Sequence, residues 1–148
     1  MNALAAWFDD YAVGDVIESP SRVVEADDVR AYVRFSNDVR PLLHQPSPDD
    51  PLPIPAMYLF SLGVGLLLHA DHAYIPEHFV AFFGFDEIRH ECDAVAGVRI
   101  RSTATVTELT PRGRNGLVHY RHETADAAGN VLVSSRQAIL VKRSPDYA

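Results

Sequence analysis

The feature that most constrains this chain is an almost wholly apolar run from Ile54 to Ala70, which contains no Asp, Glu, Lys or Arg. The last proline of this region is Pro55. After it, apolar side chains fall on all sides of a helix over 56–70, so other structure must enclose this helix. The run is shorter than the ~20 residues of a membrane-spanning helix. Gly63 and Gly65 each cost a helix roughly 1 kcal/mol relative to Ala, so we expect close approach of a strand or second helix there.

The C-terminal half reads as β-structure. Apolar and polar residues alternate over 98–107, the pattern of a half-buried strand. Further strands are expected over 80–89, 117–124 and 131–142, with a short strand within 10–24 and a short helix over 26–35. No crossover helix separates the late strands, which indicates an α+β fold. We therefore expect an antiparallel sheet wrapped around one long apolar helix, which is a hot-dog shape.

A proline-rich loop joins the two expected helices. Six of the ten prolines lie within residues 36–55, where each removes an N–H and restricts its predecessor. Asp38 and His44 lie six residues apart in this stiff loop. A carboxylate and an imidazole can together hold and deprotonate a water molecule. The spacing equally fits an Asp38 that caps a turn and a His44 on a surface loop.

Length and charge narrow the class of protein. At 148 residues the chain is expected to be one domain, 1–148, with a core over about 8–142 and a tail over 143–148. Its net charge of −7, without any basic run, excludes a nucleic-acid partner. A single cysteine, Cys92, makes no internal disulfide, and the acidic N-terminal segment does not resemble a signal peptide, so we expect a cytoplasmic protein with no membrane segment.

Several histidines could carry chemistry elsewhere. One group, near the end of the apolar helix, comprises His69, His72 and His78 together with Asp71. Its spacing matches no known ligand motif, so we expect no metal site. Another group lies on expected strands and comprises His90, His119 and His122. Surface or interface positions are expected for these three.

Three stretches resemble the MaoC-like hydratase/dehydratase family. They read NDVRPLLH over 37–44, IPAMYLFSLGVGLL over 54–67 and FGFDEIRH over 83–90. The corresponding family patterns are a G-D-x-N-P-L-H loop, a helix led by A-H-G-M and a late G-L-D-x-x-R-F strand. The resemblance extends from about Phe8 to Lys142. It implies a hot-dog fold and (R)-specific hydration or dehydration of enoyl thioesters.

The resemblance also implies an active site. The family aspartate corresponds to Asp38. The family histidine falls at Leu43, so His44 takes its role only if the loop contains a one-residue bulge. Ala56, followed by Met57, stands where the family has the glycine whose backbone N–H binds the thioester carbonyl.

The implied reaction adds water to a 2-enoyl thioester or removes it from a 3-hydroxyacyl thioester. Coenzyme A and an acyl-carrier protein are both open as the carrier, and no metal or organic cofactor is required. The substrate-binding residues expected along the loop and the apolar helix are Arg40, Tyr58, Phe60 and Ser61. Family members pair through their sheets, so a homodimer is expected, with a heterodimer as the rival assembly.

Other function classes remain open. One is a catalytically degenerate hot-dog protein that acts as a partner subunit or binds acyl groups or small molecules. Another is an enzyme of a different reaction on the same fold. A thioesterase is disfavoured because the helix over 56–70 has no Asp or Glu to serve as base or nucleophile. Candidates for a basic carrier-binding patch are Arg99, Arg101, Arg112 and Arg114, although a solvated strand face explains them equally well.

Overall fold

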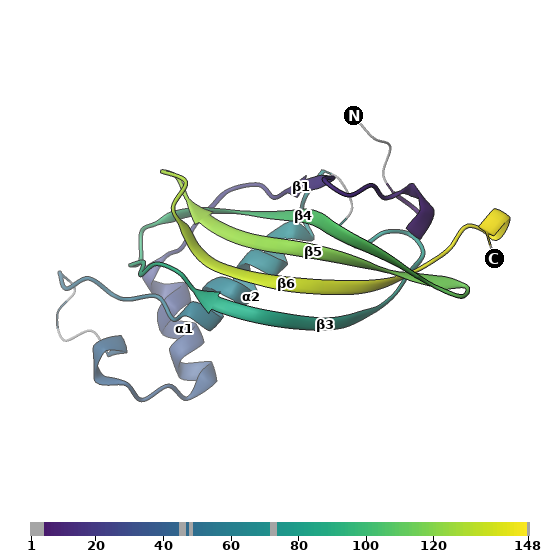
Figure 1. Ribbon diagram of the computed structural model, residues 1–148. Helices are drawn as coiled ribbons and strands as arrows, with labels where there is room; N and C mark the ends of the chain where they lie inside the picture. The colour runs from purple at the N-terminus through teal and green to yellow at the C-terminus, as the bar shows by residue number, and fades with distance from the viewer. Residues whose placement is uncertain (1–4, 45–46, 48, 72–73, 148) are drawn as a thin grey trace.

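The computed structural model describes residues 5–44, 47, 49–71 and 74–147. Two helices, α1 (Ala26–Ser36) and α2 (Ala56–Leu67), accompany an antiparallel sheet (Figure 1). Its strands in the described residues are β1 (Val16–Glu18), β2 (Arg22–Val23), β3 (Phe79–His90), β4 (Arg99–Arg112), β5 (Asn115–Asp126) and β6 (Val131–Lys142). Short 3-10 segments cover Phe8–Asp10, Pro41–Leu43 and Pro145–Tyr147. The expected α+β class is confirmed.

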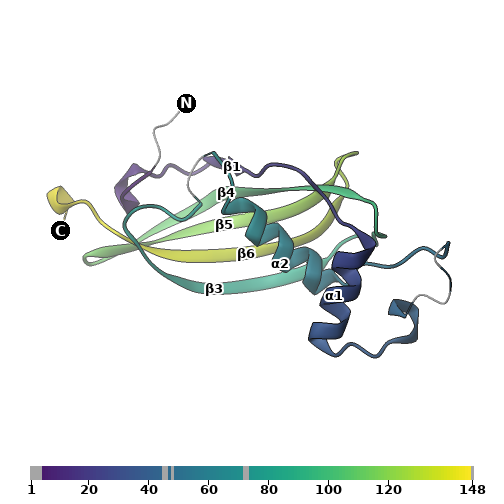
Figure 2. The same cartoon turned by 180° about the vertical axis from the view of Figure 1, so that it is seen from behind.

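The sheet runs in the order β1-β4-β5-β6-β3, with β2 also paired to β4. Helix α2 lies across one face and contacts β4, β5 and β6, while α1 and the loop after it lie at one end of the molecule, beside the start of α2 (Figures 1 and 2). This is the hot-dog arrangement expected from the sequence. Among the described residues, no helix has the length and apolarity needed to cross a membrane.

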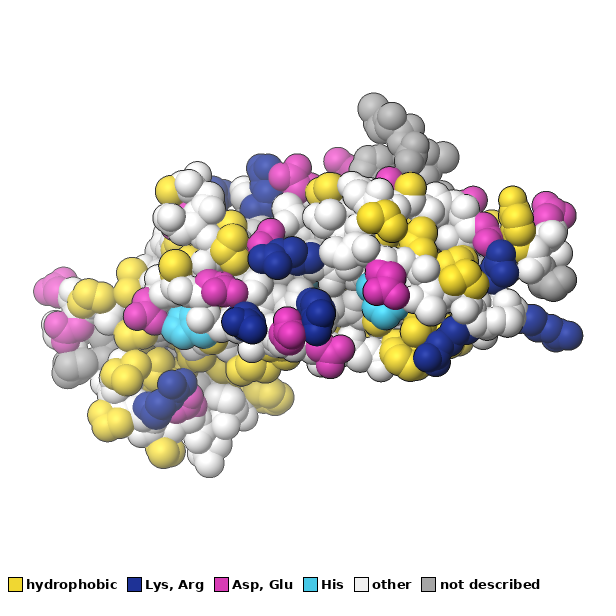
Figure 3. All heavy atoms as spheres, viewed as in Figure 1, with side chains coloured by type: hydrophobic (Ala, Val, Ile, Leu, Met, Phe, Trp, Pro, Cys, Tyr) yellow, Lys and Arg dark blue, Asp and Glu magenta, His cyan; other side chains and the backbone are white. Residues whose placement is uncertain are grey.

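Alternation along the strands separates a buried face from a charged one. On β5, the side chains of Val118, Tyr120, His122 and Thr124 are buried beneath α2. The opposite face, shown in Figure 3, carries interspersed basic and acidic side chains, including an Arg121–Glu123 ion pair. The expectation that His122 lies at the surface or an interface is wrong, since its exposure is 0%. The period of two that buries Tyr120 also buries His122.

The two helix glycines have different surroundings. A Cβ on Gly63 would lie 2.0 Å from Oγ1 of Thr124 and 2.8 Å from Oγ of Ser102, so the close approach expected there is confirmed. A Cβ on Gly65 would meet nothing within 4 Å, so the same expectation is wrong for Gly65. The helix ends at Leu67 rather than at Ala70, because the next amides bond three residues back, as in Ala70 N–H to Leu67 O at 3.2 Å.

A chain of buried polar side chains lies under Gly63. We call it the buried polar chain, and its members in order are Tyr74, Gln137, Ser135, His122, Thr124 and Ser102. Each of the six is at most 2% exposed. Buried polar groups cost free energy unless they are hydrogen-bonded, and here each side chain contacts the next.

The donors of the buried polar chain can be assigned in sequence. Tyr74 OH donates to Oε1 of Gln137, whose Nε2 donates to Ser135 Oγ at 3.0 Å. The Ser135 hydroxyl then donates to Nδ1 of His122 at 3.2 Å, which places the imidazole proton on Nε2. That Nε2–H donates to Thr124 Oγ1 at 3.3 Å. The order requires a neutral His122, and burial lowers the pKa of His122 to about 4.

Candidate functional site

The loop after α1 reverses direction within a few residues. Asn37 ends α1 in the left-handed region with φ 54°, and the Asp38 amide donates to Val33 O at 3.1 Å. The 3-10 turn over Pro41–Leu43 follows, where the His44 amide donates to Pro41 O at 3.0 Å. This turn brings His44 back toward Asp38.

The carboxylate of Asp38 is held by Arg40. Nε of Arg40 lies 3.0 Å from Oδ1 and 3.1 Å from Oδ2, and Nη2 lies 2.6 Å from Oδ2. The backbone N–H of Arg40 adds a bond to Oδ1 at 3.1 Å. Hydrogen bonds from the Arg40 side chain and amide hold the pKa of Asp38 below its usual value, and the nearby His44 also contributes to the decrease.

The imidazole of His44 contacts the backbone of Asp38 rather than its carboxylate. Nε2 of His44 lies 3.1 Å from the Asp38 carbonyl oxygen. A carbonyl oxygen only accepts, so Nε2 carries the proton and Nδ1 keeps the lone pair in the neutral ring. Leu43, at the family's histidine position, is 3% exposed and packs in the core. The side chain of His44 is exposed and faces away from that core.

The start of α2 presents unused backbone donors. The amides of Tyr58 and Leu59 both donate to Pro55 O, at 2.9 and 3.1 Å. Among the described residues, the amides of Ala56 and Met57 have no backbone acceptor, as is usual for the first residues of a helix. These free N–H groups and the helix dipole favour negative charge.

Aromatic stacking connects the loop to this helix start. Tyr32 of α1 stacks on Tyr58 of α2, with ring centroids 4.9 Å apart. Asp38 raises the pKa of Arg40, and Tyr32 lies close enough to contribute to the same increase. Sequence reasoning missed Tyr32, although its position one turn before Ser36 places it on the same side of α1 as the loop.

The remaining expected substrate-binding residues lie apart from this contact. Phe60 is buried against the sheet, 5.5 Å from the ring of Phe85 and 5.9 Å from that of His122. Ser61 is exposed on α2. The structure therefore brings together Asp38, Arg40 and His44, connects Tyr58 to them through Tyr32, and turns Phe60 into the core.

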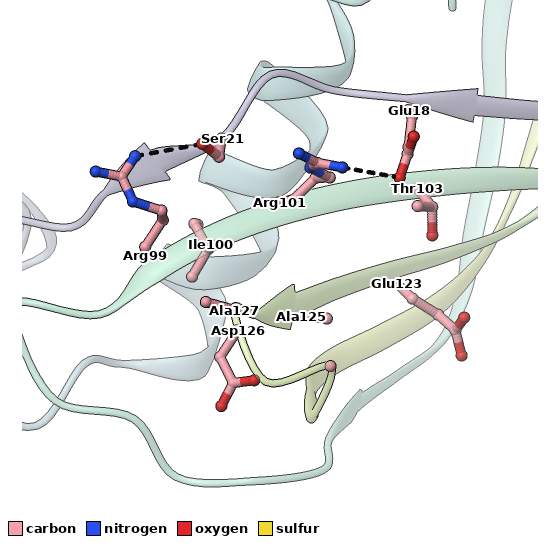
Figure 4. A pocket seen from close by; sticks show the side chains of 11 residues that line it. Glu18, Ser21, Arg99, Ile100, Arg101, Thr103, Glu123, Ala125, Asp126 and Ala127 are labelled. Carbon is pink, nitrogen blue, oxygen red and sulfur yellow. Dashed lines mark hydrogen bonds and ion pairs between the residues drawn. The ribbon is translucent and has the colours of Figure 1, made fainter.

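Two cavities lie at the positions expected to bind ligands, one at the loop and one at the arginines of the sheet. One, of about 330 Å³, lies beside His44 and is lined by Arg30, Val33, Arg34 and Leu43. The other, of about 390 Å³, lies on the outer face of the sheet and contains Arg99 and Arg101 (Figure 4). There Arg101 pairs with Glu18 at 3.2 Å and Arg99 donates to Ser21 Oγ at 3.3 Å.

The cavity of Figure 4 also holds acidic groups. Glu123 and Asp126 line it together with Glu18, so its charges are mixed rather than basic. In the part of the chain that the structure describes, no three His, Cys, Asp or Glu side chains gather as a metal site. His72 of the histidine-rich segment lies outside the described residues.

Comparisons with known proteins place the fold. No protein-family model matches the chain, and no curated protein matches it by sequence. Among solved structures, a monoamine oxidase regulatory protein from Archaeoglobus fulgidus is 21% identical with a TM-score of 0.81, over 98% of this chain and 99% of that one. A MaoC-like dehydratase from Rhodospirillum rubrum is 21% identical with a TM-score of 0.79, over 95% and 99%.

An (R)-hydratase from A. caviae involved in PHA biosynthesis is 19% identical, with a TM-score of 0.68 over 90% of this chain and 98% of that one. These matches extend over nearly the whole length on both sides. The chain therefore has the hot-dog fold of MaoC-like dehydratases and (R)-hydratases, as its sequence motifs predict.

Proposed function

We propose that this protein is a hydratase/dehydratase that adds water to a 2-enoyl thioester, or removes it from a 3-hydroxyacyl thioester, in the cytoplasm. The acyl group is carried on coenzyme A or an acyl-carrier protein. The observation that supports this most is that the loop brings His44 beside Asp38, with Nε2 of His44 3.1 Å from the Asp38 backbone carbonyl, in a fold shared with hydratases over almost its full length. Leu43, which precedes His44 in the sequence, packs in the core cluster against which Ala56 and Tyr58 of the α2 start also pack, so the loop is anchored beside this helix end.

In the proposed reaction, Asp38 and His44 bind one water molecule. Nδ1 of His44 takes a proton from this water as its oxygen bonds to the β-carbon, while Asp38 accepts a hydrogen bond that orients it. The carbon–carbon double bond becomes single as its electron pair moves toward the thioester. The protonated His44 then gives the proton taken from the water to the α-carbon, which restores the neutral imidazole. Dehydration follows the same steps in reverse.

Negative charge develops on the thioester oxygen as the water adds. The free amides at the start of α2 are suited to this charge, because preorganised donors stabilise a transition state without having to reorient. Ala56 supplies the principal N–H and Met57 the second in this proposal. The acyl chain would lie along the exposed side of α2, beside Tyr58 and Ser61, with Arg40 at its edge.

We further propose a homodimer, formed through β3. Among the described strands, β3 pairs only with β6, so its other edge has no partner. It exposes five large apolar side chains: Val80, Phe82, Phe83, Phe85 and Ile88. A long exposed edge strand of this composition pairs readily with another strand. Pairing of two β3 strands would join the sheets of two chains.

Light scattering tests this assembly. Wild-type protein is expected at twice the 16.4 kDa chain mass, and Val80→Lys is expected to shift it to the monomer by placing charges across the seam. Val13→Lys, at an exposed apolar residue away from β3, is the matched control and should stay dimeric. A monomeric wild type would overturn the homodimer and favour a heterodimer.

The activity itself is tested by hydration of short and long trans-2-enoyl-CoA, followed through the loss of enoyl absorbance. Asp38→Asn and His44→Ala should each lower kcat/KM by roughly 10²–10⁴-fold, the range for removing a general acid or base. Matched controls are Asp27→Asn on α1 and His90→Ala on β3, which should retain activity. Turnover that survives both site changes would assign the chemistry to other residues.

A second candidate function is a non-catalytic binding subunit. The observation that favours it is that the Arg40 guanidinium is hydrogen-bonded to the Asp38 carboxylate, with Nη2 2.6 Å from Oδ2. A folded dimer that binds a saturated acyl-CoA but hydrates no enoyl thioester would support this reading over the enzyme.

A further inference from the structure

We propose that Arg40 binds a carboxylate carried by the acyl group of the substrate, so that the protein prefers dicarboxylic acyl thioesters. The inference rests on the proposed function, because it places the acyl group beside Asp38. It departs from the family pattern, in which asparagine occupies the position of Arg40.

The guanidinium of Arg40 has one edge in use and one edge free. Asp38 accepts hydrogen bonds from Nε and Nη2. Within the described part of the chain, Nη1 contacts no acceptor, although a guanidinium carries five N–H donors in one plane. The Arg40 side chain is 57% exposed, against 20% for Asp38, so the free edge is the one in solvent. Such an edge matches a carboxylate or phosphate through two parallel hydrogen bonds.

Position decides between these two anions. In the proposed reaction Asp38 touches the attacking water and Arg40 is bonded to Asp38, so the free edge of Arg40 lies one carboxylate and one guanidinium beyond that water. A substituent on the acyl chain reaches this distance. The phosphate of coenzyme A or of a carrier protein is separated from the thioester by the whole pantetheine arm. The geometry therefore favours an acyl carboxylate over a carrier phosphate.

A second carboxylate also resolves the obstacle that Arg40 poses to catalysis. Arg40 donates hydrogen bonds to both oxygens of Asp38 and balances its charge. When the substrate carboxylate takes the free edge, one cation is shared between two anions, and its hold on Asp38 weakens. The oxygens of Asp38 then become available to the water. Substrates that lack the carboxylate leave Asp38 held.

Matched substrates test the proposal. Glutaconyl-CoA and trans-2-pentenoyl-CoA have the same chain length and differ in the terminal carboxylate. The wild type should favour glutaconyl-CoA in kcat/KM, and Arg40→Gln should lower this ratio by roughly 10- to 100-fold, the value of a charge-assisted hydrogen bond or two. Arg121→Gln, which breaks an exposed arginine–carboxylate pair with Glu123 on the outer face of the sheet, is the matched control and should keep the ratio. An unchanged ratio in Arg40→Gln would overturn the proposal.

Two further arms separate the sources of failure. If the carrier phosphate were the ligand, Arg40→Gln would instead lose the preference for pentenoyl-CoA over the pantetheine thioester, and the proposal would be wrong. Calorimetric binding of glutaryl-CoA and pentanoyl-CoA tests Arg40 without any turnover. Weaker binding of glutaryl-CoA alone in Arg40→Gln would support the proposal even if no hydration occurred, in which case only the proposed function would fail.

Discussion

Two histidines in this molecule lie in opposite kinds of surroundings. His122 has both ring nitrogens hydrogen-bonded inside the buried polar chain, under α2 and without exposure to solvent. His44 lies exposed on the proline-rich loop, with Nε2 on the Asp38 carbonyl and Nδ1 without a hydrogen bond in the described residues. The first ring can change neither its proton nor its partners without disturbing the core. The second keeps a lone pair available.

The difference separates polar groups that hold the fold from polar groups that can perform chemistry. In the buried polar chain each side chain is hydrogen-bonded to the next, and removal of one partner would leave a buried group unsatisfied at a cost of about 1–3 kcal/mol. On the loop, the Asp38–Arg40 pair is in contact with water, so either side chain can replace a hydrogen-bonding partner with water at little cost in free energy. A catalytic role therefore fits the loop far better than the more conspicuous buried network.

The largest effects that would test this difference are expected when each histidine is substituted in turn. His44→Ala should lower enoyl-CoA hydration by roughly 10²–10⁴-fold while the melting temperature stays that of the wild type. His122→Gln should lower the melting temperature, because an amide only approximates the imidazole in the chain. Circular dichroism melts and initial rates on both variants measure the separation. A large stability loss in His44→Ala would show that the loop, too, is structural.

Acid sharpens the same comparison. Burial lowers the pKa of His122 to about 4 from 6.5, so between these values the unfolded chain binds a proton that the folded chain does not. Stability therefore rises with pH from 4 to 6.5 and levels off above. Across this window the titration of His122 changes the free energy of unfolding by about 3 kcal/mol, at 1.36 kcal/mol for each pKa unit. Urea unfolding across this window measures it.

His122→Gln serves as the control for that measurement. Glutamine does not titrate, so the slope between pH 4 and 6.5 should be smaller in this variant than in the wild type. Equal slopes would assign the acid sensitivity to other groups and would contradict the neutral, fully bonded ring.

The fold could be predicted because its signals are periodic and local. Alternation located β4 to β6, and the lack of any charge over 56–67 required an enclosed helix. The positions of Asp38 and His44 within one loop were also readable. Their partners were not, because the short 3-10 turn over Pro41–Leu43 and the Arg40 fork depend on backbone geometry that spacing does not encode. His122 was misjudged for a different reason: a surface or interface position was expected for every strand histidine, whereas the period of two that buries Tyr120 also buries His122.

Gly63 offers a test of the buried side alone. Gly63→Ala places a Cβ 2.0 Å from Thr124 Oγ1, so the strand or helix must shift, and overpacking of this kind costs about 1–3 kcal/mol. Gly65→Ala is the matched control, since it meets no atom and should gain up to about 1 kcal/mol of helix propensity. Denaturant unfolding compares the two. A stabilised Gly63→Ala would mean that α2 does not press on the buried polar chain.

The smallest effect is expected where two arginine–aspartate pairs are compared. Arg143 bonds Asp9 at 2.9 Å with both side chains mostly covered, and its loss through Arg143→Gln should cost about 1 kcal/mol because it ties the C-terminal segment to the N-terminal 3-10 turn. Arg40→Gln breaks a shorter pair, at 2.6 Å, whose arginine is mostly exposed, and should leave the melting temperature unchanged. Thermal melts at low and high salt measure both. If the Asp38–Arg40 pair adds nothing to stability, Arg40 can change partners when a substrate binds. A clear decrease of the melting temperature in Arg40→Gln would instead show that the pair stabilises the fold.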